Sequence, residues 1–215
     1  MATVTINAVP STTLADNDGI APMAVRLAPL IQLDDQAFMQ LADQNPDYRF
    51  EQNSAGELVI MAPTGGDSGN QNFDLLLQLG MWHKKHKLGK CFDSSTMFVL
   101  PNRARRSPDA SWVANSRWNA LTKEQQRSFP PICPDFVIEL RSPSDQLHVL
   151  TDKMAEYLAN GAQLGWLIDP RNKTVHVYRP GSEPVILQSP PSVSGEPLLP
   201  GFTLDTTELF SISVE

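Results

Sequence analysis

The 215-residue sequence contains only two cysteines, Cys91 and Cys133, and neither belongs to a CxxC pair. Zinc ligation by thiolates is therefore not expected, and two thiols buried as small hydrophobic side chains are the simplest interpretation. No apolar run reaches the roughly 20 residues that a membrane-spanning helix needs. The first ten residues also lack the basic and apolar regions of a signal peptide. We therefore expect a cytoplasmic protein with no membrane partner.

Excess positive charge is also missing, since the formal net charge is -7. Proteins that coat nucleic acids are usually basic, because contacts of Lys and Arg with phosphates supply much of the affinity. The composition therefore argues against tight non-specific binding of nucleic acid. It argues less against catalysis, because carboxylates that bind a metal add negative charge themselves. Local basic clusters remain at 84–90 and 103–106.

The domain organisation is simple. The sequence has no internal repeat, and its length suits one domain with a sizeable core. Residues 1–30 are rich in Thr, Ala, Pro and Asp without a sustained period, which predicts a loosely ordered N-terminal segment. We expect residues 31–215 to form the single folded domain.

Helical and strand patterns alternate along the domain. Helical spacing predicts helices over 34–42, 68–88 and 145–160, with a short one within 115–131. Alternating or continuous apolar runs predict strands over 48–51, 58–61, 91–93, 96–100, 109–113, 136–140, 164–168 and 174–178. The longest helix would bury Phe73, Leu76, Leu77, Leu79 and Trp82. This order predicts an α/β fold with a mixed sheet flanked by helices.

An acidic residue interrupts the strongest predicted strand. Within Phe136–Leu140 side chains alternate, so Glu139 points away from Ile138 and shares a face with Arg141. A carboxylate among strongly apolar neighbours is costly unless a charged group compensates it. The two candidates for that compensation are Arg141 and a metal ion.

A second carboxylate, Asp109, opens another predicted strand directly after a proline. If Asp109 and Glu139 meet at adjacent strand ends they repel one another, and a divalent cation relieves that repulsion. Oxygen ligands favour Mg²⁺ or Mn²⁺ over zinc. Such an ion polarises a phosphoryl oxygen and activates a bound water, which phosphodiester hydrolysis requires.

Lys153 lies at the edge of the apolar stripe of the helix that follows. Its stem could run along the sheet and bring the ammonium to the two carboxylates. Helical spacing alone favours the alternative, in which Lys153 extends into solvent. Asp152 and Glu156 fall on the polar side of the same helix.

The segment Gly66-Asp67-Ser68-Gly69 is similar to the nucleophile loop of serine proteases, but the histidine and disulfides which that chemistry needs are absent. No Gly-Lys-Ser/Thr sequence supports an ATP-binding P-loop. The backbone N–H groups of this segment could still bind a phosphate at the start of the long helix.

The residues from Pro134 to Pro170 show a resemblance to a known family. The string Val137-Ile138-Glu139-Leu140-Arg141-Ser142-Pro143-Ser144-Asp145 is followed by Lys153-Met154, Tyr157, Asn160-Gly161-Ala162 and Gly165-Trp166-Leu167-Ile168-Asp169-Pro170. This pattern resembles the Uma-type restriction endonuclease family of the PD-(D/E)XK superfamily. The resemblance extends over about 33–179 and implies a restriction-endonuclease-like fold.

The resemblance also implies roles for particular residues. Asp109 and Glu139 match the acidic pair of the superfamily motif. Arg141 stands where most members have lysine, and Lys153 matches a lysine that has moved to the next helix. Which of the two is the working cation stays open, although only lysine could take part in acid-base chemistry. Glu51 matches an acidic residue that could contact the metal through water, whereas Asn70 and Gln71 resemble a polar pair that could face the site.

We therefore expect a metal-dependent endonuclease that hydrolyses phosphodiester bonds, with DNA as the expected substrate and the choice between DNA and RNA left open by the sequence. Asp109 and Glu139 would bind Mg²⁺ or Mn²⁺ with help from the carbonyl of Leu140, and Lys153 would position or deprotonate water. The resemblance further implies a homodimer, as in nucleases that cut both strands. The alternatives are a non-catalytic module of the same fold that binds nucleic acid or protein, and an enzyme acting on another phosphorylated substrate.

Overall fold

The computed structural model of the chain describes residues 22–27, 31, 33–61 and 63–211. Its helices are α1 (Asp35–Gln44), α2 (Gly66–His86), α3 (Asn115–Trp118), α4 (Lys123–Arg127) and α5 (Leu147–Ala159). Its strands are β1 (Met23–Arg26), β2 (Arg49–Gln52), β3 (Glu57–Met61), β4 (Gly89–Asp93), β5 (Phe98–Val99), β6 (Arg105–Arg106), β7 (Ala110–Ala114), β8 (Phe136–Leu140), β9 (Leu164–Asp169), β10 (Thr174–Tyr178), β11 (Val185–Gln188), β12 (Ser192–Ser194) and β13 (Thr203–Asp205).

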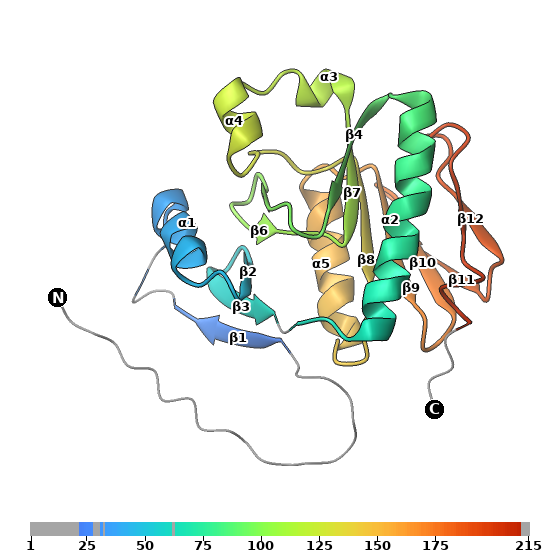
Figure 1. Cartoon of the computed structure of the whole chain (residues 1–215), viewed down its shortest axis with the longest axis horizontal. Helices are drawn as coiled ribbons and strands as arrows, with labels where there is room; N and C mark the ends of the chain where they lie inside the picture. Colours follow the sequence, from blue (N-terminus) through green and yellow to red (C-terminus); the bar gives the residue numbers. More distant parts are fainter. Residues whose placement is uncertain (1–21, 28–30, 32, 62, 212–215) are drawn as a thin grey trace, which may run out of the picture.

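A six-stranded sheet in the order β11-β10-β9-β8-β7-β4 forms the centre of the molecule (Figure 1). The pair β8 and β9 is parallel, because α5 crosses over between the two strands, and the other pairs are antiparallel. The sheet is therefore mixed, and helices flank it as the sequence predicts.

The two faces of the central sheet pack against different helices. On one face Phe136 and Ile138 of β8 join Leu75 and Leu79 of α2 in a hydrophobic cluster. On the other face Val137 packs in a second cluster with side chains of α5. Because side chains alternate along a strand, Glu139 falls on the α5 face with Val137. This face contains the site described below.

A smaller sheet in the order β1-β3-β2-β6-β5 lies beside the central sheet. The predicted hairpin β2–β3 supplies its middle, with Glu51 paired to Val59. The strands β1 and β6 were not predicted, because β1 lies in the segment without a sustained period and β6 has only two residues. Of the predicted loosely ordered segment, residues 1–21 and 28–30 lie outside the described residues, and Met23–Arg26 form β1.

Several predicted boundaries are confirmed and others shift. Asp34 caps α1 by accepting a hydrogen bond from the Ala37 N–H, and β8 spans the predicted residues. The helix α5 begins at Leu147 rather than at Asp145, whose carboxylate instead accepts hydrogen bonds from Ser142. The prediction that Phe73 and Leu77 are buried is wrong.

The side chains of Phe73 and Leu77 are 66% and 47% exposed. The helix α2 packs through Leu75, Leu79 and Trp82 instead. Apolar residues occur around most of its circumference, so periodicity alone could not select the stripe that meets the sheet.

Candidate active site

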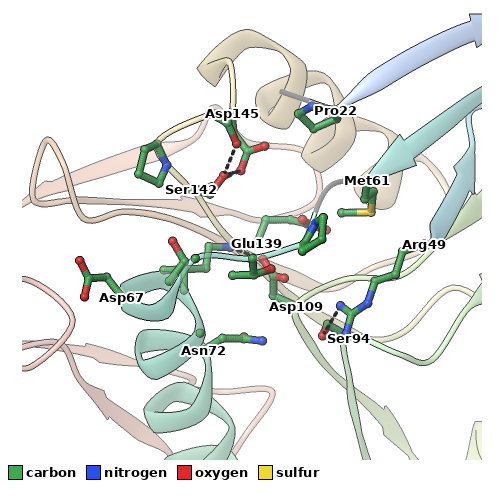
Figure 2. A pocket seen from close by; sticks show the side chains of 18 of the residues that line it. Pro22, Arg49, Met61, Asp67, Asn72, Ser94, Asp109, Glu139, Ser142 and Asp145 are labelled. Atoms are coloured by element: carbon green, nitrogen blue, oxygen red, sulfur yellow. Dashed lines mark hydrogen bonds between the residues drawn. The ribbon is translucent and has the colours of Figure 1, made fainter. Parts of the chain in front are cut away.

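The pairing of β7 with β8 brings the two predicted carboxylates together. Ala110 pairs with Ile138 in this antiparallel ladder, so Asp109, one residue earlier, comes opposite Glu139. An oxygen of Asp109 accepts a hydrogen bond of 2.7 Å from the Leu140 N–H, which fixes the carboxylate at the end of β8. Asp109 and Glu139 line the same pocket (Figure 2).

The carboxylate of Glu139 is buried and has two partners from α5. The Tyr157 hydroxyl donates to Glu139 Oε1 over 3.0 Å, and the Lys153 ammonium donates to Glu139 Oε2 over the same distance. Lys153 and Tyr157 lie one helical turn apart and therefore extend from the same side of α5. The ammonium thus reaches the carboxylate rather than solvent, and the side chain of Lys153 is only 7% exposed.

Lys153 also joins the two sheets. Its ammonium lies 2.9 Å from Glu51 Oε1 on β2, so one buried cation contacts two buried carboxylates. Glu51 has further donors in Arg106, whose Nη1 lies 3.1 Å from Oε2, and in the Ser107 N–H at 2.8 Å. Glu51 therefore approaches the site through Lys153, which it shares with Glu139, and its expected contact with a metal through water stays a prediction.

Arg106 and Glu156 extend this buried charge network. The Arg106 Nε donates to Glu156 Oε2 over 2.6 Å, and the Glu156 side chain is 12% exposed. Glu156 lies on the polar side of α5, and the smaller sheet covers that side of the helix with Arg106. The complete chain of contacts consists of Glu139, Lys153, Glu51, Arg106 and Glu156.

Burial changes the ionisation of these groups. It raises the pKa of Asp109 to about 6, even though the Leu140 N–H and Lys153 act in the opposite direction. Burial also raises the pKa of Glu139, and the nearby carboxylates of Asp109 and Glu51 add to this effect. Burial would lower the pKa of Lys153, but Glu139 and Glu51 reverse this and raise it, so the ammonium stays charged.

The pocket has a volume of about 500 Å³ and opens between α2, β2 and the loop after β8. Besides the carboxylates and Lys153, its walls are formed by residues 63–69, Asn72, Arg49, Ser94 and 142–145. Figure 2 shows Asp109 and Glu139 at its centre, with Arg49 and Ser94 on one side and α2 on another. Neighbouring carboxylates on the floor of an open pocket can accept a cation from solvent.

Two residues assigned to the site from the sequence have other partners. Arg141 Nη1 donates to Asp169 Oδ2 over 2.7 Å, and Arg141 does not line the pocket. Gln71 is buried, but its amide donates to the Leu209 carbonyl over 2.8 Å, so it binds the C-terminal segment. Asn70 is exposed and also lies outside the pocket. The interpretation of Asn70 and Gln71 as site-facing residues is wrong.

Sequence reasoning did not assign Tyr157, Arg106 or Asn72 to the site. Tyr157 appeared within the string that carries the family resemblance, and its hydroxyl gave no separate signal. Arg106 belonged to a basic cluster to which no partner was assigned. Ser68 was considered only as part of a segment whose backbone could bind phosphate. Its spacing of four residues from Asn72 in a predicted helix was the one available sign that the two share a face.

The donor set suits a hard divalent cation. Among the described residues no three His, Cys, Asp or Glu side chains form a cluster that could hold a metal. An ion here would therefore depend on Asp109, Glu139, backbone oxygen such as the Leu140 carbonyl, and water. Mg²⁺ is commonly bound in this way, through one or two carboxylates with several retained waters. Burial raises the pKa of both carboxyl groups, so a bound cation would favour the ionised forms that can coordinate it.

A family model described as "Putative restriction endonuclease", Uma2, matches residues 35–207, which include the whole site. The chain belongs to this family. No curated protein matches it. The matched residues contain the central sheet, α2, α5 and every strand of the smaller sheet except β1.

A solved structure from Anabaena variabilis ATCC 29413 supports the same fold. It is described as a "putative nuclease belonging to DUF820" and is 23% identical to this Uma2 protein. The match covers 83% of this chain and 98% of the other, with a TM-score of 0.69. The fold is thus restriction-endonuclease-like. None of the described helices combines the length and the apolar character needed to cross a bilayer.

Proposed function

We propose that the protein is a metal-dependent endonuclease that hydrolyses phosphodiester bonds in DNA. One observation carries the proposal: the register of β7 and β8 places Asp109 opposite Glu139 in a pocket, and Lys153 contacts Glu139 there. Membership of a restriction endonuclease family supports the same conclusion. Asp109, Glu139 and the Leu140 carbonyl would hold Mg²⁺ or Mn²⁺. Once bound, the ion would supply Lewis-acid polarisation of the phosphate and an activated water.

Lys153 acts in this proposal as a fixed cation. Its pKa is raised by Glu139 and Glu51, so it has no tendency to lose a proton and act as a base. A charged donor beside Glu139 orients that carboxylate and stabilises negative charge that develops on the phosphate. Arg141 makes no such contact because Asp169 holds it. The contacts of the two cations therefore support Lys153, rather than Arg141, as the working cation of the proposal.

Cleavage of plasmid DNA tests the proposal. The wild-type protein should nick or linearise the plasmid with Mg²⁺ or Mn²⁺ and lose this activity with EDTA. Asp109→Asn, Glu139→Gln and Lys153→Met should each lower the rate by at least about 100-fold, since each removes a group that acts on the reacting phosphate. Arg141→Lys, which keeps a cation beside Asp169, is the matched control and should retain most of the activity.

A non-catalytic binding module is the second candidate, and the net charge of -7 favours it. Such a module would shift the mobility of DNA without cleaving it, and Asp109→Asn would leave that binding unchanged. That result would contradict the endonuclease proposal.

We also propose a homodimer, because the resemblance is to nucleases that cut both strands of a duplex and two paired sites would cut both strands in one encounter. Light scattering coupled to size exclusion should give twice the mass of the chain. If the protein is a monomer that nicks only one strand, the homodimer proposal is wrong.

A further inference from the structure

The first turn of α2 enters the same pocket as the carboxylates. Residues 65–69 all line it, and the first intrahelical bond runs from the Gly69 N–H to the Gly65 carbonyl. The N–H groups of Gly66, Asp67 and Ser68 therefore precede the hydrogen-bond ladder of the helix. No side chain caps this end of the helix. A 21-residue helix thus directs its positive dipole end toward the pocket.

A hydroxyl at the wall of the pocket has no protein partner. The residue Ser68 is 9% exposed and lines the pocket, and no hydrogen bond joins its hydroxyl to another described residue. The hydroxyl is therefore free to donate to an oxygen of a ligand in the pocket.

Asn72 lies one turn further along α2 and extends the same polar face. Its Oδ1 is buried without a hydrogen-bond partner, and the residue lines the pocket. Figure 2 shows the Asn72 side chain directed toward the part of the pocket that contains Asp109, whereas Asp67 points away from it. The face of α2 that meets the carboxylates thus consists of amide and hydroxyl groups.

The glycines of this turn are not required by packing. A Cβ at Gly65, Gly66 or Gly69 would meet no atom within 4 Å, and none of the three has a positive φ. Their effect is to leave the backbone N–H groups open to close approach from the pocket. On the opposite wall Arg49 of β2 donates to the Ser94 hydroxyl over 3.0 Å and supplies a cation at the pocket edge.

We propose that the first turn of α2, with Ser68 and Asn72, binds a backbone phosphate next to the one that is cut. This inference rests on the proposed function. The N–H groups and the Ser68 hydroxyl would donate to the phosphate oxygens, and the helix dipole would favour the negative charge. Asn72 would donate through its amide nitrogen. A subsite of this kind lets an acidic protein hold nucleic acid through a few directed contacts rather than through a basic surface.

Phosphate binding can be measured without any cleavage. Inorganic phosphate is titrated at constant ionic strength into ¹⁵N-labelled protein carrying Asp109→Asn, which cannot support the metal-dependent reaction. The amide resonances of residues 66–68 should shift and saturate. Adding Ser68→Asp should weaken binding at least about tenfold, because a carboxylate would occupy the anion position. This substitution is compatible with folding, since acidic residues are favoured in the first turn of a helix.

Asn70→Asp is the matched control, because it adds the same charge to the same helix at an exposed position outside the pocket. It should change the dissociation constant less than about twofold. Ser68→Ala, which only removes the hydroxyl, should weaken binding a few-fold and decides the question if Ser68→Asp fails to fold. Two results would overturn the subsite. One is that Ser68→Asp and Asn70→Asp weaken phosphate binding equally. The other is that phosphate shifts amide resonances located away from α2.

The two proposals fail separately. If phosphate shifts residues 66–68 but the wild-type protein cuts no DNA with any divalent metal, the subsite stands without the nuclease activity. If the wild-type protein cuts DNA and phosphate leaves α2 unaffected, the activity stands and the subsite is wrong.

Discussion

The ammonium of Lys153 lies 2.9 Å from Glu51 Oε1, and both side chains are at least nine-tenths buried. The two residues come from α5 and from the smaller sheet, so this contact joins the two parts of the fold at the site. A cation that contacts two buried carboxylates fixes their positions and reduces their repulsion. The same contact therefore contributes to stability and to the electrostatics of the pocket.

Removing Lys153 should strongly destabilise the protein. Lys153→Met would leave Glu51 and Glu139 buried without their shared cation, and loss of one partner of a buried pair typically costs about 3–5 kcal/mol. Denaturant unfolding measures this loss. Glu51→Gln in the same protein should recover part of it, so the double variant should be more stable than the sum of the single effects predicts. Additive effects would show that the contact between the two residues contributes little.

Without metal, ionisation of Asp109 should reduce the free energy of unfolding as pH rises through the acidic range. The pKa of Asp109 is raised from 3.8 to about 6 by burial, so the folded state holds a proton that the unfolded state releases between these values. The contribution of Asp109 to stability therefore falls as pH rises from about 4 to 6 and stays lower above that range. A shift of this size corresponds to at most about 3 kcal/mol.

Asp109→Asn removes that penalty and should be more stable than the wild-type protein at pH 8 in EDTA. The difference in free energy of unfolding between the two proteins should decrease toward pH 4. Urea unfolding across the pH range measures it. Asp152→Asn, at an exposed position on α5, should follow the wild-type curve. Parallel curves for wild type and Asp109→Asn would contradict the assigned burial effect.

Divalent metal should stabilise the folded protein through the carboxylate pair. Mn²⁺ at 100 times its dissociation constant should add about 2.7 kcal/mol. Asp109→Asn and Glu139→Gln should abolish most of this gain in thermal unfolding. Asp67→Asn is the control, since Asp67 lines the pocket but points away from the carboxylates (Figure 2). If all three variants lose the Mn²⁺-dependent stabilisation equally, the metal is attracted diffusely by negative charge rather than bound at a specific site.

Binding to DNA should depend only weakly on salt. Arg49 and Lys153 are the cations among the residues that line the pocket, and Lys153 is already paired. With one or two phosphates neutralised, the logarithm of affinity should fall with the logarithm of salt concentration with a slope of about -1 to -2. Fluorescence anisotropy of a labelled duplex with the Asp109→Asn protein gives this slope. A slope steeper than about -5 would require an extended basic surface instead.

The local pattern of the sequence predicted where Glu139 and Lys153 lie on their strand and helix. The apolar run around Glu139 predicted both the strand and the cost of burying its carboxylate, because alternation depends only on neighbouring residues. The edge position of Lys153 on its helix followed from helical geometry in the same way. The family resemblance then selected Asp109 as the partner of Glu139.

Tertiary structure alone decided which charged groups meet. Arg141 shares the strand face with Glu139 by spacing, yet Asp169 on the next strand holds its guanidinium. Glu156 is on the polar side of its helix, but the smaller sheet covers that side and supplies Arg106. These partners are separated by 28 and 50 residues in the chain. Local periodicity specifies the face on which a side chain lies, whereas the group that it contacts depends on how distant segments pack.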